Sequence, residues 1–288
     1  ILVADFKATG ADTVLSGVLA EAMRSSLGQS RAVRIVPTSA VVAALTRMAR
    51  PVTSKVDDAL AQEIATREGI KGIVSGEVTA IGGGYLVTVR LLGAATGDVL
   101  ASFPQSANGA ADLIPAIDNL GRKLRGKIGE SLRAVQNAPA LAKVTTTSLT
   151  ALRKYTEGAR AHDVDRAYDK SIPLFNEAIA LDSNFAMAYR KLAMSLTQTD
   201  ASKIGALLDK AYARRDHFGE GERLAVMAEY YRSGSHQDRA KALAALEELV
   251  RAYPEVAVTF GANNTGVLYM SRREYARAES LFTIAIQN

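Results

Sequence analysis

The stretch SIPLFNEAIALDSNFAMAYRKLAMSL, from Ser171 to Leu196, decides how the second half of this 288-residue chain folds. Phe175 and Ala178 lie three residues apart on a first predicted helix, which ends near Leu181. The second predicted helix carries Tyr189, Leu192, Ala193 and Leu196. Bulky and small apolar residues at helical spacing on two successive helices predict close packing where the small residues fall. The stretch therefore predicts an antiparallel pair of helices.

The same spacing returns near the C-terminus, in the residues Gly266, Tyr269, Tyr275, Ala278, Phe282 and Ala285. Helical periodicity after the middle of the chain predicts four pairs: 149–161 with 169–181, 186–197 with 202–215, 222–232 with 237–252, and 260–271 with 274–287. This pattern resembles the tetratricopeptide repeat (TPR), a helix–turn–helix unit of about 34 residues. The family's usual Trp is absent, and Ser183 stands where a Pro is common. The resemblance implies an array that binds other proteins.

The first half mixes helical and alternating patterns. Ile1 to Phe6 is a short apolar run typical of a buried strand, and Val33 to Val36 predicts a second strand. The predicted helices are 13–27, 38–48, 54–68 and 112–135, with Ser54 and Asp57 as a capping box for the third. Alternation over 72–81, 85–92 and 99–103, with glycine-containing turns, predicts a three-stranded meander. The first half is therefore expected to be an α/β domain with a mixed sheet.

This order of strands and helices is similar to the amino-terminal domain family of the periplasmic protein TolB. Followed by TPR-like repeats, it resembles the extracytoplasmic regions of bacterial membrane-anchored Ser/Thr kinases and related regulators, where the pair serves in sensing or docking. We expect an α/β domain over 1–136, a linker over 137–147 and an all-α TPR-like solenoid over 148–288. The chain starts in a strand without Met and stops inside a helix, so we expect both ends to be cut from a longer polypeptide.

The composition limits the class of partner. The net charge is +5, with 16 Lys and Arg against 12 Asp and Glu up to Lys143, which is far below the charge density of a nucleic-acid binder. We therefore expect no nucleic-acid partner, but the basic first half allows a peripheral membrane contact. The absence of Cys excludes disulfides, thiolate metal sites and a Cys nucleophile. No apolar run approaches the roughly 20 residues that span a bilayer.

No motif for catalysis is present. Gly82 to Gly84 joins two alternating strands and lacks the Gly-Lys-Ser/Thr ending of a nucleotide loop, so it predicts a hairpin turn. His162, His217 and His236 are not spaced as metal ligands, and kinase and hydrolase motifs are missing. Asp5 lies at the end of the first predicted strand. An alternative hypothesis is that its side chain faces a ligand crevice, as at the strand ends of open α/β sheets. We expect no enzyme activity, no cofactor and no metal.

Two groups of residues are candidates for binding a partner. The repeat resemblance implies a concave groove lined by the first helix of each pair, with the candidates Met187, Arg190, Met194, Asn263 and Met270. Met side chains adapt to irregular partners, and Arg is frequent at interfaces. The alternative is that these Met side chains pack between repeats. Arg122, Arg125 and Arg133 project opposite the apolar stripe of the 112–135 helix. They form either an ordinary solvated face or a basic docking face for acidic lipid or protein.

Together these features predict a protein–protein interaction scaffold. Its partners would be subunits of a larger membrane complex, on which it docks as a membrane-extrinsic subunit at an extracytoplasmic (periplasmic) surface. The alternative is the extracytoplasmic sensor or ligand-binding region of a membrane-anchored Ser/Thr kinase or transcriptional regulator.

Overall fold

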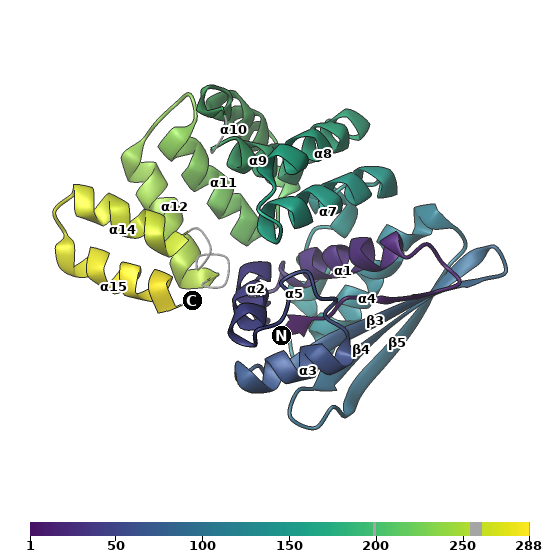
Figure 1. Cartoon of the computed structure of the whole chain (residues 1–288). Coiled ribbons are helices and arrows are strands. Elements are labelled where there is room, and N and C mark those ends of the chain that lie inside the picture. Colours follow the sequence, from purple (N-terminus) through teal and green to yellow (C-terminus); the bar gives the residue numbers. More distant parts are fainter. Residues whose placement is uncertain (198–199, 254–260, 288) are drawn as a thin grey trace.

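The computed structural model describes residues 1–197, 200–253 and 261–287 (Figure 1). A mixed five-stranded sheet with helices forms the first half, and a series of helices follows, as the sequence predicts. The first half contains β1 (Leu2–Val3), β2 (Lys7–Thr9), α1 (Val14–Leu27), α2 (Thr38–Arg47), α3 (Asp58–Arg67), β3 (Gly72–Ile81), β4 (Gly84–Gly93), β5 (Val99–Ala107), α4 (Leu113–Ile128) and α5 (Leu132–Asn137). The second half contains α6 (Leu141–Val144), α7 (Leu149–Asp163), α8 (Tyr168–Leu181), α9 (Ala186–Leu196), α10 (Ile204–Ala213), α11 (Glu220–Ser233), α12 (Arg239–Ala252), α14 (Ala262–Ser271) and α15 (Tyr275–Gln287).

The sheet is built around β3. The strand order is β1-β3-β4-β5, and β2 pairs with β3 beyond β1, so that two short parallel strands share one edge. The strands β3, β4 and β5 form the antiparallel meander that the alternating pattern predicts. Gly82 and Gly83 have φ angles of 57° and 87°, which side chains other than Gly rarely adopt. The glycine run is therefore a hairpin turn, as predicted.

Helices cover both faces of the sheet near β1. Leu2 packs with α2 and α3, whereas its neighbour Val3 packs with α1 and α4, because successive side chains of a strand point to opposite faces. A Cβ on Gly121 of α4 would lie 2.1 Å from the Ser26 hydroxyl oxygen of α1. A glycine at this position therefore lets α1 and α4 approach closely.

Three local predictions for the first half are wrong. The segment Val33–Val36 is not a strand; the Val36 N–H donates to the carbonyl oxygen of Ile1 at 2.9 Å, without a continuing ladder. The predicted 112–135 helix is divided, because Gly129 adopts a left-handed φ of 104° after α4 and ends it.

The third error concerns a helix cap. Asp57, and not Ser54, caps α3, and its carboxylate accepts a hydrogen bond from the Leu60 N–H. The side chain at the cap position must lie just before the first helical turn, and α3 starts only at Asp58.

The four predicted helix pairs are present as α7/α8, α9/α10, α11/α12 and α14/α15, although Phe260, predicted to start the last pair, lies outside the described residues. Small residues do lie where the helices meet. A Cβ on Gly158 would lie 2.9 Å from the Phe175 ring, and one on Gly266 would lie 2.7 Å from Phe282. Tyr275, by contrast, is 63% exposed instead of packed.

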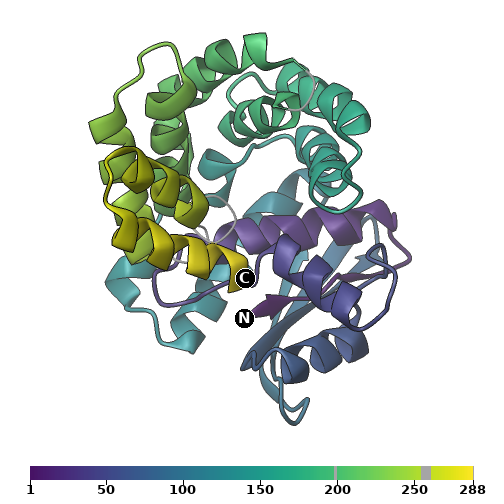
Figure 2. The same cartoon turned by 60° about the vertical axis from the view of Figure 1, so that its left-hand side comes forward.

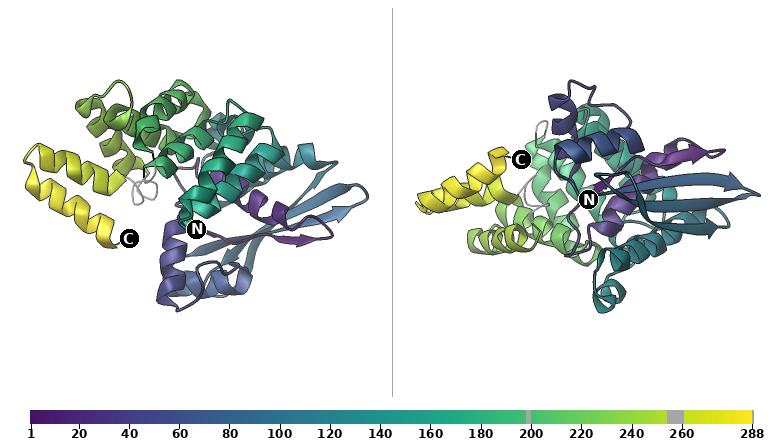
Figure 3. Two further views of the ribbon diagram at one scale, coloured as in Figure 1. Left: turned by 45° about the horizontal axis from the view of Figure 1, so that its top comes forward. Right: turned by 90° about the horizontal axis from the view of Figure 1, so that it is seen from below.

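The helical pairs follow an arc beside the α/β part (Figure 2). In the views of Figures 1 and 3 the free ends of the strands and the α14/α15 pair lie at opposite ends of the molecule. Of the helix pairs, α7/α8 is placed against the α/β part through α7, which contacts α1.

One hydrophobic cluster crosses from the sheet into the array. It includes Leu19 of α1, Leu120 of α4, Leu141 of α6 and Leu152 of α7, each at most 1% exposed. The segment 137–147, which we predicted to be a linker, thus contains a buried helix that packs on both sides. The division of the chain into two domains stays a prediction.

We expect Leu141→Ala to destabilise the whole chain. Removing a fully buried Leu side chain costs about 2–5 kcal/mol of unfolding free energy. Because α6 packs on both halves, thermal unfolding followed by circular dichroism is expected to remain a single transition at lower temperature. Leu132→Ala is the control, since Leu132 is 72% exposed. Two separate transitions, of which only one moves, would contradict the shared core.

Candidate functional site

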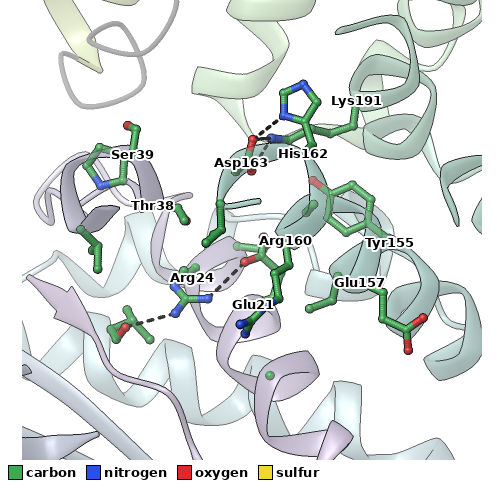
Figure 4. A pocket seen from close by; sticks show the side chains of 18 of the residues that line it. Glu21, Arg24, Thr38, Ser39, Tyr155, Glu157, Arg160, His162, Asp163 and Lys191 are labelled. Carbon is green, nitrogen blue, oxygen red and sulfur yellow. Dashed lines mark hydrogen bonds and ion pairs between the residues drawn. The ribbon is translucent and has the colours of Figure 1, made fainter. Parts of the chain in front are cut away.

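A large cavity lies between the α/β part and the start of the helical array. Its volume is about 1070 Å³, at the upper end of the roughly 300–1,000 Å³ of small-molecule sites. Helices α1 and α2 and the segment before α3 form one wall, and α7, α9 and the start of α11 form the other. Figure 4 shows side chains from both walls pointing toward this space.

On the helical wall, three polar side chains form one cluster at the end of α7. The Lys191 ammonium lies 2.7 and 2.8 Å from the two carboxylate oxygens of Asp163, and the His162 Nδ1 lies 2.7 Å from one of them (Figure 4). Burial opposes the charged form of Asp163, but the charge of Lys191 and the hydrogen bonds from His162 and Lys191 lower its pKa to about 2. Asp163 is therefore ionised at neutral pH.

Sequence reasoning missed this cluster. In the sequence, His162 has no second His or Cys at the spacing of metal ligands, so it did not indicate a site. The partner Lys191 is 28 residues away from Asp163, on the next first helix of the array. Only the packing of α9 beside α7 brings these groups together. A local sequence pattern therefore cannot predict the cluster.

On the opposite wall, Arg24 of α1 holds two carboxylates. Its guanidinium lies 3.3 Å from Glu21 and 3.8 Å from Asp5, and it donates to the carbonyl oxygen of Val3 at 3.2 Å. Asp5 also accepts from the Val56 N–H at 2.8 Å. Asp5 thus lines the cavity, where the alternative hypothesis from the sequence placed it.

Tyr155 of α7 lies between these groups. Its side chain is 2% exposed and packs against the Phe185 ring with centroids 4.9 Å apart. No residue in the described part of the chain makes a hydrogen bond to its hydroxyl, which points into the cavity (Figure 4). Burial raises the pKa of Tyr155 well above its usual value, so the hydroxyl remains a donor at neutral pH.

The five residues that the sequence suggested for a partner-binding groove lie in two different places in the structure. Met187, Arg190 and Met194 line the cavity. Asn263 and Met270 are exposed on α14 and do not line it. The groove predicted from the repeat resemblance is therefore not one continuous surface, because α1 and α2 cover its first part.

Arg190 is not available as an exposed anchor. It is 7% exposed, its guanidinium donates to both carboxylate oxygens of Glu229 at 2.7–3.1 Å, and it also pairs with Glu222. A buried guanidinium needs such partners, and removing one of them is strongly destabilising. The interpretation of Arg190 as a partner-binding residue is corrected: it ties α9 to α11.

The predicted basic face on α4 is also corrected. Arg125 is 2% exposed and makes a two-pronged pair with Glu130 at 2.7 and 2.8 Å. Arg122 donates to the carbonyl oxygens of Val135 and Ala138 at 2.7 and 3.0 Å. Of the three arginines only Arg133 is exposed. The chain turns back after α4 and brings these acceptors over the arginines, so a solvated cluster does not form.

Within residues 1–197, 200–253 and 261–287, no three His, Asp or Glu side chains are grouped closely enough to hold a metal ion. None of the helices in the same segments combines the length and apolar character needed to cross a membrane.

No family model matches this sequence, and a search of curated proteins gives no match. Among solved structures, the chain is weakly similar to the LpoB C-terminal domain from Salmonella enterica, with 14% sequence identity and a TM-score of 0.32. The similarity covers 37% of this chain and 79% of the LpoB domain. A similarity of this size carries no argument about function.

We expect Asp163→Asn to lower the unfolding free energy by about 2 kcal/mol at neutral pH. The folded-state pKa of Asp163 is below the unfolded value, so its contribution is present above pH 4 and is lost as the pH falls from about 4 to about 2. Urea titrations between pH 2 and pH 7 measure the difference between wild type and variant.

Asp165→Asn is the matched control, because Asp165 is exposed and close by in the sequence. A difference between wild type and Asp163→Asn that persists unchanged at pH 2 would contradict the electrostatic origin.

Proposed function

We propose that this chain is a non-enzymatic protein-interaction scaffold. In this proposal it is a membrane-extrinsic accessory subunit that docks on, or stabilises, a larger membrane complex at an extracytoplasmic surface. The extracytoplasmic location is supported by the sequence resemblance to TolB-like domains followed by TPR-like repeats. The absence of catalytic motifs from the sequence supports a binding role in place of an enzymatic one.

The observation that carries this proposal is the exposure of apolar side chains on the last helix pair. Half of the large apolar residues that are exposed in the described part of the chain lie on α14 and α15: Val267 (45%), Met270 (50%), Tyr275 (63%), Ile284 (38%) and Ile286 (84%). Exposed apolar patches of soluble proteins often mark sites of protein interaction. Met270, a candidate from the sequence, belongs to this group, which we call the α14/α15 surface.

The cavity favours a second candidate function, the sensor region of a membrane-anchored Ser/Thr kinase or transcriptional regulator. A ligand in the cavity would contact α1 and α2 on one side and α7 and α9 on the other. Such a ligand would shift the arrangement of the two walls only if it bound one arrangement more tightly than another.

Affinity capture from native membranes tests the scaffold. The full chain is immobilised and incubated with detergent-solubilised membranes, and retained proteins are identified by mass spectrometry. We expect one defined membrane complex to bind in high salt, and Met270→Glu to weaken its binding roughly tenfold or more, because a charge enters an apolar contact.

Leu181→Glu is the matched control. Leu181 is 49% exposed, close to the 50% of Met270, and both residues lie near the C-terminal end of a helix, but Leu181 is on α8. Both variants are expected to unfold within about 0.5 kcal/mol of the wild type, since both sites are surface sites. Equal binding by both variants, or recovery of the native chain only in the cytosolic fraction, would contradict the proposal.

A further inference from the structure

Every carboxylate that lines the cavity in the described part of the chain lies beside a cation of the protein. Each of the five that line it in the described part of the chain has a cation within 4 Å: Asp5 and Glu21 with Arg24, Glu157 with Arg153, Asp163 with Lys191, and Glu222 with Arg190. A cationic ligand would have to displace one of these pairs. A positively charged ligand would thus meet carboxylates that already have cationic partners, two of which, Arg24 and Arg190, are each shared by two carboxylates.

Two cations of the lining have no such compensation. Arg160 of α7 and Arg166, just after it, line the cavity, and no carboxylate of the described residues lies within 4 Å of either guanidinium. The hydrogen bond of the Arg160 side chain goes to the carbonyl oxygen of Thr53, at 3.4 Å. A guanidinium has five N–H donors, so Arg160 retains donors for an anion. Both side chains are exposed and therefore free to meet an anion at the cavity.

The N-terminus of α2 adds to this positive potential from the opposite wall. Its first turn contains no acidic residue, and the residue before it is Pro37, which cannot cap the helix with a side chain. The hydroxyls of Thr38 and Ser39 line the cavity and have no partner among the described residues. The first N–H groups of a helix lack intrahelical acceptors and favour negative charge.

A separate observation points to a ligand. Tyr155 is only 2% exposed as a residue, and its hydroxyl points into the cavity without a hydrogen-bond partner in the described chain (Figure 4). This hydroxyl is therefore available to donate to an acceptor that is held in the cavity.

Part of the lining is apolar. Val14 and Val18 of α1, Val41 and Val42 of α2, and Met187 and Met194 of α9 contribute aliphatic and thioether surface. The part of a ligand that lies against these six side chains is favoured to be apolar, because a polar group would lose its hydration there.

We propose that this cavity binds a small amphipathic carboxylate. The apolar body lies between the valines of α1 and α2 and the methionines of α9. The carboxylate accepts hydrogen bonds from Arg160, with Arg166 and the N-terminus of α2 supplying positive potential and Tyr155 a further donor. This site goes beyond the scaffold function and is separate from the α14/α15 surface.

Decanoate is a suitable probe, with decanol and decylammonium as neutral and cationic counterparts of the same chain length. Isothermal titration calorimetry on the full chain is expected to show saturable one-site binding of decanoate, with decanol and decylammonium at least tenfold weaker. We expect Arg160→Gln to weaken decanoate binding about tenfold or more. Tyr155→Phe is expected to weaken it several-fold, since its hydroxyl has no protein partner to lose.

Arg239→Gln is the matched control, because Arg239 is exposed on α12, outside the cavity lining. Met270→Glu is expected to bind decanoate like the wild type, so that failure of this site and failure of the scaffold proposal can be told apart. Decanol binding as tightly as decanoate, an unchanged affinity in Arg160→Gln, or no saturable decanoate binding would overturn the proposal.

Discussion

The hydrophobic cluster shared by the sheet, α1, α4 and α6 to α9 is the feature on which the rest of the structure depends. Each fully buried Leu or Phe side chain contributes about 1.5–3 kcal/mol through the removal of apolar surface from water. Because the cluster is continuous, the side chains that hold α1 on the sheet also hold α7 beside α1 and extend to α9. The walls of the cavity are therefore set by the core itself, and not by a few surface contacts.

Charge pairing then determines which side chains of the cavity walls are available to a ligand. Arg190 with Glu229, and Lys191 with Asp163, satisfy buried charges that would otherwise be costly, and they tie α9 to its neighbours α11 and α7. Arg160 and the start of α2 are left without a carboxylate partner in the described part of the chain. The same structure therefore combines an apolar exterior on α14 and α15 with a cavity between α2 and α7 whose side chains offer hydrogen-bond donors to an anion.

The sequence predicted what depends on local periodicity. The meander over β3 to β5 and the four helix pairs follow from alternation and from helical spacing, and Phe175 packs on Gly158 as a bulky residue on a small one. The errors arise where the partner is distant in the chain. Arg125 and Arg190 look like surface residues in a helical pattern, and only tertiary packing brings them Glu130 and Glu229. The helix α6 was not predicted, because it is only four residues long and lies in a segment with Pro and Thr residues. Such a segment is too short to show helical periodicity.

Native-state hydrogen exchange tests the shared core most directly. If α6 belongs to the core of both halves, the amide hydrogens of Thr145 and Leu152, which donate to Leu141 and Ser148, will exchange as slowly as those in the centre of β3 and β4. Their opening free energy will then approach that of global unfolding. Exchange of these amides within minutes, while β3 and β4 stay protected for hours, would show that the two halves meet only through a loose contact and would contradict the account.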